Sequence, residues 1–167
     1  MIWFQLFFFE KVRGYIIPIL KSCLSLSDYM YVNYLSVCRN TTRLITAVGS
    51  IHSPEFPSRD YPTNADCVWQ ITTPYNTRMR FKIMHMSIQS CGKSGTPEYC
   101  SCDYLEIRDG SSSSDRLLAT LCGAGPELPE TIYSSGRNLW VRFKSDGEVV
   151  SSGFVARFSS ETIREGE

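Results

Sequence analysis

Apolar and polar residues alternate with a period of two along most of the chain from residue 43 onward. Such alternation is typical of strands that bury one face, and no segment holds the 3.6-residue period of an amphipathic helix. The alternating runs are 67–71, 79–83, 104–110, 138–147 and 153–160. Short stretches rich in Gly, Pro, Ser and Asp separate them and read as turns. The pattern predicts an all-β fold, a two-sheet antiparallel β-sandwich in which each sheet has one wet face.

The alternation changes parity within one of these runs. Odd-numbered positions are apolar from Met79 to Ile83, whereas even-numbered positions are apolar from Met84 to Ile88. One extra residue in a strand produces such a slip, so we predict a β-bulge or strand break near Ile83–Met84. The methionines of this segment, Met79, Met84 and Met86, are predicted to fill the core.

Composition bounds the classes that the protein can belong to. The 167 residues are 43% apolar, enough for one packed domain and a tail. Lys plus Arg and Asp plus Glu are both 17, which gives a formal net charge of zero. This balance argues against a basic nucleic-acid-binding surface and against an acidic solvating tail.

Seven cysteines, at positions 23, 38, 67, 91, 100, 102 and 122, are many for a chain of this size. Six of them lie between residues 38 and 122, which predicts three disulfides formed in an oxidising compartment. A structural zinc site would need two close ligand pairs, but Cys100 and Cys102 are the one close pair. The two histidines, His52 and His85, do not complete such a site and are predicted to be an exposed loop residue and a core or edge residue.

The two ends of the chain are set apart from this pattern. Residues 1–37 are apolar and aromatic but interrupted by charges and Pro18, and are predicted to be a degenerate signal or targeting segment or a wrongly assigned start of a longer gene product. Residues 160–167 are predicted to be a polar C-terminal tail or truncated linker. Asn40-Thr41-Thr42 is a sequon that predicts N-glycosylation at Asn40.

Six short motifs occur in an order that resembles a known extracellular module. They are "GSIHSPEFPSRDYP", "CVWQI", "C-x-x-DYLEIRDG", "LCG", "SSGRNLWVRFKSDG" and "SGFVARF". Over residues 38–159 the sequence resembles the CUB domain, a β-sandwich of complement proteases, tolloid-type proteinases, neuropilins and spermadhesins. The fifth motif is particularly similar to CUB domains of neuropilin- and tolloid-like transmembrane proteins.

The resemblance implies a disulfide pattern. The family joins its first cysteine to its second and its third to its fourth, and the third precedes an Asp by three positions. Carried over, with the two extra cysteines paired to each other, the implied bridges are Cys38–Cys67, Cys100–Cys122 and Cys91–Cys102. The alternative exchanges partners to give Cys91–Cys100 and Cys102–Cys122. Cys100 and Cys102 would point to the same face of a strand, so both arrangements stay open.

The resemblance also implies a calcium site near one end of the sandwich. The family's site uses a Glu, the Asp of C-x-x-D, the Asp of a Ser-Asp turn and a supporting Tyr, and the matching positions are Gln89, Asp103, Asp146 and Tyr61. Gln89 replaces the Glu and removes one charge, so the resemblance implies a calcium site that is weak or absent. The turn before Tyr61 is one residue longer than the family pattern, which predicts a displaced tyrosine. The competing interpretation is that both aspartates are turn residues.

No catalytic motif accompanies these residues: the sequence has no G-x-S-x-G elbow, no H-E-x-x-H and no phosphate-binding glycine loop. We therefore predict a non-enzymatic extracellular protein–protein interaction module, secreted or part of a membrane protein's ectodomain. The resemblance implies a partner protein whose basic side chain reaches the acidic loops. The alternatives are a non-catalytic fragment of a tolloid- or complement-type protease and an ectodomain piece of a transmembrane co-receptor or auxiliary subunit.

Overall fold

The computed structural model divides the chain into two compact units, Met1–Ser36 and Val37–Glu167. It describes residues 9–12, 15–18, 38, 41–96, 98–125 and 131–163. In the first unit, β1 (Phe9–Val12) and β2 (Tyr15–Pro18) form an antiparallel pair. Cys23 and the predicted glycosylation site Asn40 lie outside the described residues, so the glycosylation stays a prediction. Over the part of the chain that is described, no helix has the length and apolar character needed to cross a membrane.

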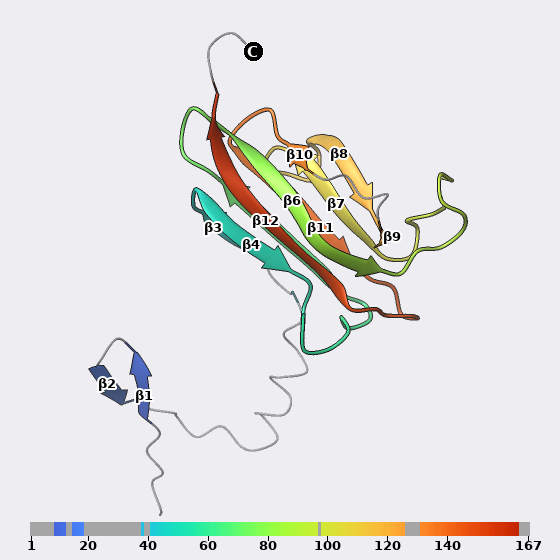
Figure 1. Ribbon diagram of the computed structural model, residues 1–167, viewed down its shortest axis with the longest axis horizontal. Coiled ribbons are helices and arrows are strands. Elements are labelled where there is room, and N and C mark those ends of the chain that lie inside the picture. Colours follow the sequence, from blue (N-terminus) through green and yellow to red (C-terminus); the bar gives the residue numbers. More distant parts are fainter. Residues whose placement is uncertain are drawn as a thin grey trace, which may run out of the picture. The chain divides into compact units, whose positions relative to one another are not determined.

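Two five-stranded sheets build the second unit (Figure 1). The first has the order β10-β6-β12-β4, and β9 also pairs with β6. Its strands are β4 (Val48–His52), β6 (Thr77–Ile88), β9 (Gly123–Ala124), β10 (Ile132–Tyr133) and β12 (Gly153–Thr162). The second sheet has the order β3-β5-β11-β7-β8. Its strands are β3 (Thr42–Ile45), β5 (Asp66–Thr72), β7 (Tyr104–Asp109), β8 (Arg116–Leu121) and β11 (Asn138–Lys144).

The core lies between the sheets and is made by the residues that the alternation placed inward. On β11, Leu139, Val141 and Phe143 are completely buried, and on β12 so are Phe154 and Ala156. Phe143 and Phe154 belong to different sheets, and their rings lie 5.6 Å apart. Each large side chain taken out of water here contributes about 1.5–3 kcal/mol. The predicted all-β sandwich is confirmed.

The predicted bulge lies at Met84 on β6. In the pairing with β12, Val155 lies opposite His85 and Ala156 lies opposite Ile83, so Met84 has no partner. The extra residue turns Met84 outward, where 48% of it is exposed. The prediction that Met84 fills the core is therefore wrong, whereas Met86, beyond the bulge, is buried. The bulge also leaves His85 exposed rather than in the core.

One strand pair departs from the predicted antiparallel arrangement. β3 runs parallel to β5, with Thr42 opposite Trp69 and Ile45 opposite Thr72. The Cys38–Cys67 disulfide explains this, because it fixes Cys38, four residues before β3, beside the beginning of β5. Two strands tied at their starting ends run in the same direction.

The last strand is longer than the alternation predicted. β12 continues to Thr162, and Glu161 pairs with Arg78 across the sheet, with the guanidinium Nε 3.5 Å from the carboxylate. Residues 160–162 of the predicted tail are therefore strand. Residues 164–167 lie outside the described part of the chain.

A test of the packing uses Gly49, which lies opposite Phe158 in the β4–β12 pair. A Cβ at this position would approach Cζ of Phe158 to 2.5 Å, and Phe158 is only 2% exposed. We expect Gly49→Ala to lower the free energy of unfolding by about 1–3 kcal/mol, because the ring must shift within a packed core. Urea denaturation measures this loss.

Gly136→Ala is the matched control, since a Cβ there meets no atom within 4 Å. We expect its effect to stay within about 0.5 kcal/mol. Equal losses in the two variants would contradict the contact of Gly49 with Phe158.

Candidate functional site

The loop between β4 and β5 is fastened to the start of β12, and this fixes Tyr61. Ser53 donates its backbone N–H to the carbonyl of Phe154 and accepts the Phe154 N–H on its hydroxyl, at 3.0 and 3.1 Å. Tyr61 then donates its N–H to the carbonyl of Ser151. Its ring packs edge-on against Phe143 at 5.1 Å, and the residue is 1% exposed. The longer turn therefore leaves Tyr61 inside the sandwich.

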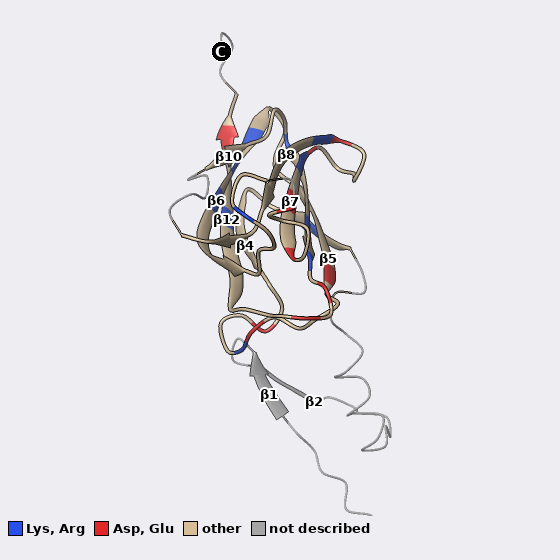
Figure 2. Ribbon diagram, turned by 90° about the vertical axis from the view of Figure 1, so that its right-hand side faces the viewer, with Lys and Arg blue, Asp and Glu red and all other residues tan. Residues whose placement is uncertain are grey.

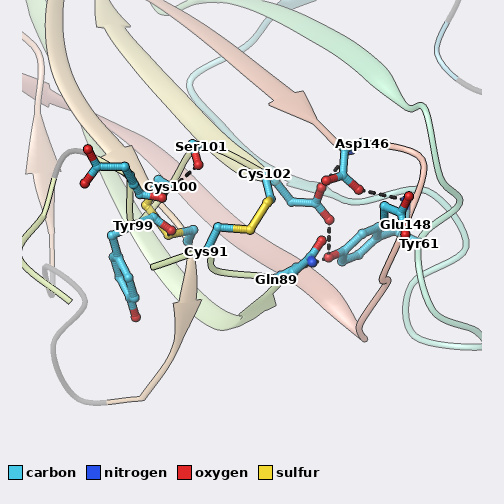
Figure 3. Close-up of a disulfide and its surroundings, with 12 residues drawn as sticks. Tyr61, Gln89, Cys91, Tyr99, Cys100, Ser101, Cys102, Asp146 and Glu148 are labelled. Atoms are coloured by element: carbon cyan, nitrogen blue, oxygen red, sulfur yellow. Dashed lines mark hydrogen bonds between the residues drawn. A yellow bond between two sulfur atoms is a disulfide. The ribbon is translucent and has the colours of Figure 1, made fainter. Parts of the chain in front are cut away.

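The hydroxyl of Tyr61 joins three segments of the chain (Figure 3). It donates to Oδ2 of Asp103 at 2.6 Å and accepts the backbone N–H of Gln89 at 2.9 Å. Gln89 follows the end of β6, and Asp103 precedes β7. Burial, with the hydrogen bond to Asp103 as a second cause, raises the pKa of Tyr61 above its ordinary value, so the phenol keeps its proton.

Asp103 is completely buried, and both of its carboxylate oxygens accept hydrogen bonds. Oδ2 accepts from Tyr61, and Oδ1 accepts the backbone N–H of Asp146 at 2.7 Å. Burying a carboxylate is costly unless such donors replace water. Asp103 thereby brings the loop after β11 to the loop before β7.

Asp146 organises the turn after β11. Its Oδ1 accepts the N–H of Glu148 at 2.9 Å, and its carbonyl accepts the N–H of Asn64 at 2.6 Å. The buried hydroxyl of Ser145 adds a second link, since it accepts the N–H of Ala65 and donates to the carbonyl of Pro62. Sequence reasoning missed Ser145, because a serine next to an Asp-Gly turn gives no signal of burial.

Gln89 carries an unused acceptor. Its side-chain Oε1 is buried and has no hydrogen-bond partner. Buried acceptors are nearly always satisfied, so this oxygen is open to a water molecule, a ligand atom or a cation. Figure 3 shows Gln89 beside Tyr61, with Asp146 and Glu148 joined to each other nearby.

The sulfurs of the six cysteines from Cys38 to Cys122 are joined in three bridges. They are Cys38–Cys67, Cys91–Cys102 and Cys100–Cys122. The alternative exchange of partners is not what the structure contains. Cys91–Cys102 lies next to the site, two residues after Gln89 and one before Asp103 (Figure 3).

The side-chain donors at this site are oxygen atoms. Among the described residues no group of three or more His, Cys, Asp or Glu side chains could hold a metal. Two carboxylates, Asp103 and Asp146, and the free amide oxygen of Gln89 are what the site offers. Calcium takes six to eight oxygens, including amide and backbone carbonyls and water, so these residues fit calcium better than zinc. Figure 2 shows acidic residues along the loops at this end of the sandwich.

The two histidines take no part in this network. Both pack on Phe56, with ring centroids 6.4 Å from His52 and 5.5 Å from His85. His52 donates its Nδ1 proton to the carbonyl of Ser53, and Nε2 of His85 bonds the hydroxyl of Ser152. They hold the loop after β4 against the sheet.

Comparison with known proteins agrees with this architecture. The family model described as "CUB domain" matches residues 38–158. Mouse tolloid-like protein 2 is 34% identical over 141 residues, which cover 84% of this chain and 13% of that protein. The CUB1-EGF-CUB2 domains of rat MASP-1 superpose with a TM-score of 0.62 and 28% identity, over 75% of this chain and 44% of that one. The MASP-1 CUB2 domain, solved bound to Ca2+, superposes with a TM-score of 0.59 and 21% identity, over 71% of this chain and 96% of that one.

Replacement of Tyr61 by Phe tests the network. Loss of the hydroxyl leaves Asp103 and the Gln89 N–H each short of a buried partner, so we expect Tyr61→Phe to lower the free energy of unfolding by about 1–3 kcal/mol. Urea denaturation at neutral pH measures the loss. Tyr75→Phe, at a tyrosine that is 81% exposed, is the matched control and should change little.

Wild type and Tyr61→Phe together also test the raised pKa of Tyr61. The native state holds the phenol proton more tightly than the unfolded state, whose tyrosines titrate at about pH 10. The stabilisation is therefore complete below that pH and is lost as the pH rises above it. The difference between wild type and Tyr61→Phe should shrink above pH 10, and a constant difference up to pH 12 would contradict the assignment.

Proposed function

Because the chain belongs to the CUB domain family, we propose that it is an extracellular, non-catalytic module that binds a partner protein, with calcium, through the loops around Asp103 and Asp146. The observation that carries the proposal is the Tyr61–Asp103–Asp146 network, in which Tyr61 and Asp103 are buried and the Tyr61 hydroxyl also accepts the backbone N–H of Gln89, whose side-chain Oε1 has no partner. A rigid acidic site of this kind offers preorganised oxygens at the end of a sandwich. Preorganisation lowers the cost of binding.

Calcium is supported by the donors that the site contains and by the Ca2+ bound to the MASP-1 CUB2 domain. A bound calcium ion supplies the positive charge that offsets the repulsion between the two carboxylates. Asp103 has both oxygens committed to internal hydrogen bonds, so it anchors the site. Asp146 and Glu148 lie in the partly or fully exposed turn and are the acidic residues that a partner can reach.

The partner would supply a Lys or Arg to this end of the sandwich. A cationic side chain forms short, charge-assisted hydrogen bonds to carboxylate oxygens, which are about twice as strong as neutral ones. The loops at this end keep a fixed position relative to the strands, because Ser53, Tyr61 and Asp146 hold them by hydrogen bonds.

An extracellular place for the module is supported by its covalent structure. Three disulfides in a single small domain persist in oxidising compartments and are rare in the cytosol. One structural neighbour is the extracellular region of zebrafish Gpr126/Adgrg6, which the chain matches with a TM-score of 0.61 and 25% identity.

A second candidate is that the module serves a larger protein. The chain spans 13% of mouse tolloid-like protein 2, which favours a non-catalytic part of a tolloid-type protease. In that case the module would position a catalytic domain that lies elsewhere in the polypeptide. A transmembrane co-receptor or auxiliary subunit is the other context in which the same site would act. The transcript beyond Glu167 separates the two, since one continues into a protease domain and the other into an apolar span of about 20 residues.

Calcium binding is tested by restoring the charge that Gln89 lacks. Wild type should bind calcium weakly in isothermal titration, and Gln89→Glu should bind about tenfold more tightly because calcium affinity rises with the number of charged ligands. Gln70→Glu, which adds the same charge on β5 outside the site, should leave the affinity unchanged. Absence of binding by both wild type and Gln89→Glu would contradict the calcium site.

Partner binding is tested by removing Asp146. Surface plasmon resonance against an array of secreted proteins and ectodomains should give partners that bind in calcium and dissociate in chelator. Asp146→Ala should abolish this binding, whereas Glu161→Ala, which changes an acidic residue of β12 outside the site, should keep it. Partners that bind equally well in chelator would exclude the calcium-dependent mechanism. The chain would then be a binding module that does not need calcium.

A further inference from the structure

The disulfide between Cys91 and Cys102 differs from the other two in its surroundings. Cys67 and Cys122 belong to the hydrophobic core, and their partners Cys38 and Cys100 pack against it. Cys91 and Cys102 are both half-buried and lie outside that core. This bridge therefore does not fasten the packed interior.

The bridge also closes the shortest loop. Its cysteines are 11 positions apart, compared with 22 for Cys100–Cys122 and 29 for Cys38–Cys67. In the chain-entropy model the stabilisation by a disulfide grows with the length of the loop it closes. Cys91–Cys102 should therefore contribute the least to the stability of the whole domain.

Its position in the fold gives it a different role. Cys91 follows β6, a strand of the first sheet, and Cys102 precedes β7, a strand of the second. Backbone hydrogen bonds hold strands within one sheet but do not fix one sheet relative to the other. The bridge, with its Cα atoms 5.8 Å apart, is a covalent tie between the two sheets at the end where the site lies.

The two segments that it ties are those that carry the site. Gln89 lies two residues before Cys91, and Asp103 immediately follows Cys102. Apart from the bridge, the Tyr61 hydroxyl links the same segments, since it accepts from Gln89 and donates to Asp103. Loss of the disulfide would leave only non-covalent contacts of the Gln89 segment to hold it near Asp103: this hydroxyl, the backbone bond from Cys91 to Tyr99, and the pairing of Ile88 with Gly123.

The loop that the bridge closes is exposed in its first half and held at its base. Its described residues between the cysteines are exposed from Gly92 to Thr96, and Gly92 and Gly95 have left-handed φ values of 74° and 83°. One backbone bond, from the N–H of Cys91 to the carbonyl of Tyr99 at 2.8 Å, crosses its base. Tyr99 and Cys100 pack against the core and Cys100 is bridged to Cys122, so the Asp103 end of the loop is fixed and the Cys91–Cys102 bridge ties the Gln89 end to it.

We propose that the Cys91–Cys102 disulfide is a positioning element of the binding site. It holds the side-chain carbonyl of Gln89 next to the carboxylates of Asp103 and Asp146, and so sets the affinity of the site for a cation. The part that concerns cation affinity rests on the proposed function. The part that concerns the position of Gln89 does not.

The test compares the full 167-residue chain with Cys91→Ser/Cys102→Ser, both produced in an oxidising host. Hydrogen exchange followed by NMR reports on the Gln89 and Asp146 amides, which donate to Tyr61 and Asp103. We expect the Gln89 amide to exchange at least about tenfold faster in the variant, with the amides of β11 unchanged, because the opening is local. Cys100→Ser/Cys122→Ser is the matched control and should speed exchange throughout the sandwich.

A double-mutant cycle gives the second readout, which a purely structural bridge would not move. In the intact protein Gln89→Glu should tighten calcium binding about tenfold, and without the bridge the gain should fall below about threefold, because the new carboxylate is no longer held at the site. An unchanged gain would overturn the positioning role.

The remaining outcomes separate the two proposals. If neither wild type nor Gln89→Glu binds calcium, the calcium site fails and hydrogen exchange at Gln89 alone decides the role of the bridge. Unchanged exchange at Gln89 in the variant overturns the inference whether or not calcium binds. A double variant that does not fold overturns it as well, since the bridge would then be a staple of the whole domain.

Discussion

A completely buried carboxylate must find hydrogen-bond donors inside the protein, and this requirement organises the end of the sandwich around Asp103. The donors come from Tyr61, in the loop after β4, and from the backbone of Asp146, in the loop after β11. Because each donor belongs to a different connection, the satisfaction of one side chain brings together segments that are distant along the chain. The loops at this end are therefore rigid before any ligand arrives.

The two sheets supply the frame on which this arrangement depends. Phe143 and Phe154 meet in the core, and the Tyr61 ring packs against Phe143, so the phenol reaches Asp103 from inside the sandwich. The core also accounts for the pKa of Tyr61, since burial is the largest cause of its rise. Packing and polar network are thus parts of one structure, and the site cannot be separated from the core beneath it.

Gln89 and the Cys91–Cys102 disulfide are the two features in which this chain departs from the family pattern at the site. An amide stands where the resemblance places a carboxylate, and its oxygen has no internal partner. The Cys91–Cys102 bridge joins the segment after β6, which carries Gln89, to the segment before β7, which carries Asp103, and so links the two sheets. A site with less charge gains more from fixed geometry, because less of the binding free energy is then lost in ordering the ligands.

The sequence by itself determined β5, β6, β7, β11 and β12, most of their inward faces and the bulge near Ile83–Met84, because period-two alternation and its change of parity are local properties of the chain. It also indicated Tyr61, Gln89, Asp103 and Asp146 through the family motifs. Only the tertiary structure decided that Met84 points to solvent, that β3 runs parallel to β5, that Ser145 is buried at the site and that the Gln89 carbonyl lacks a partner. Each of these depends on contacts between residues far apart in sequence, where spacing along the chain carries no information about which groups meet.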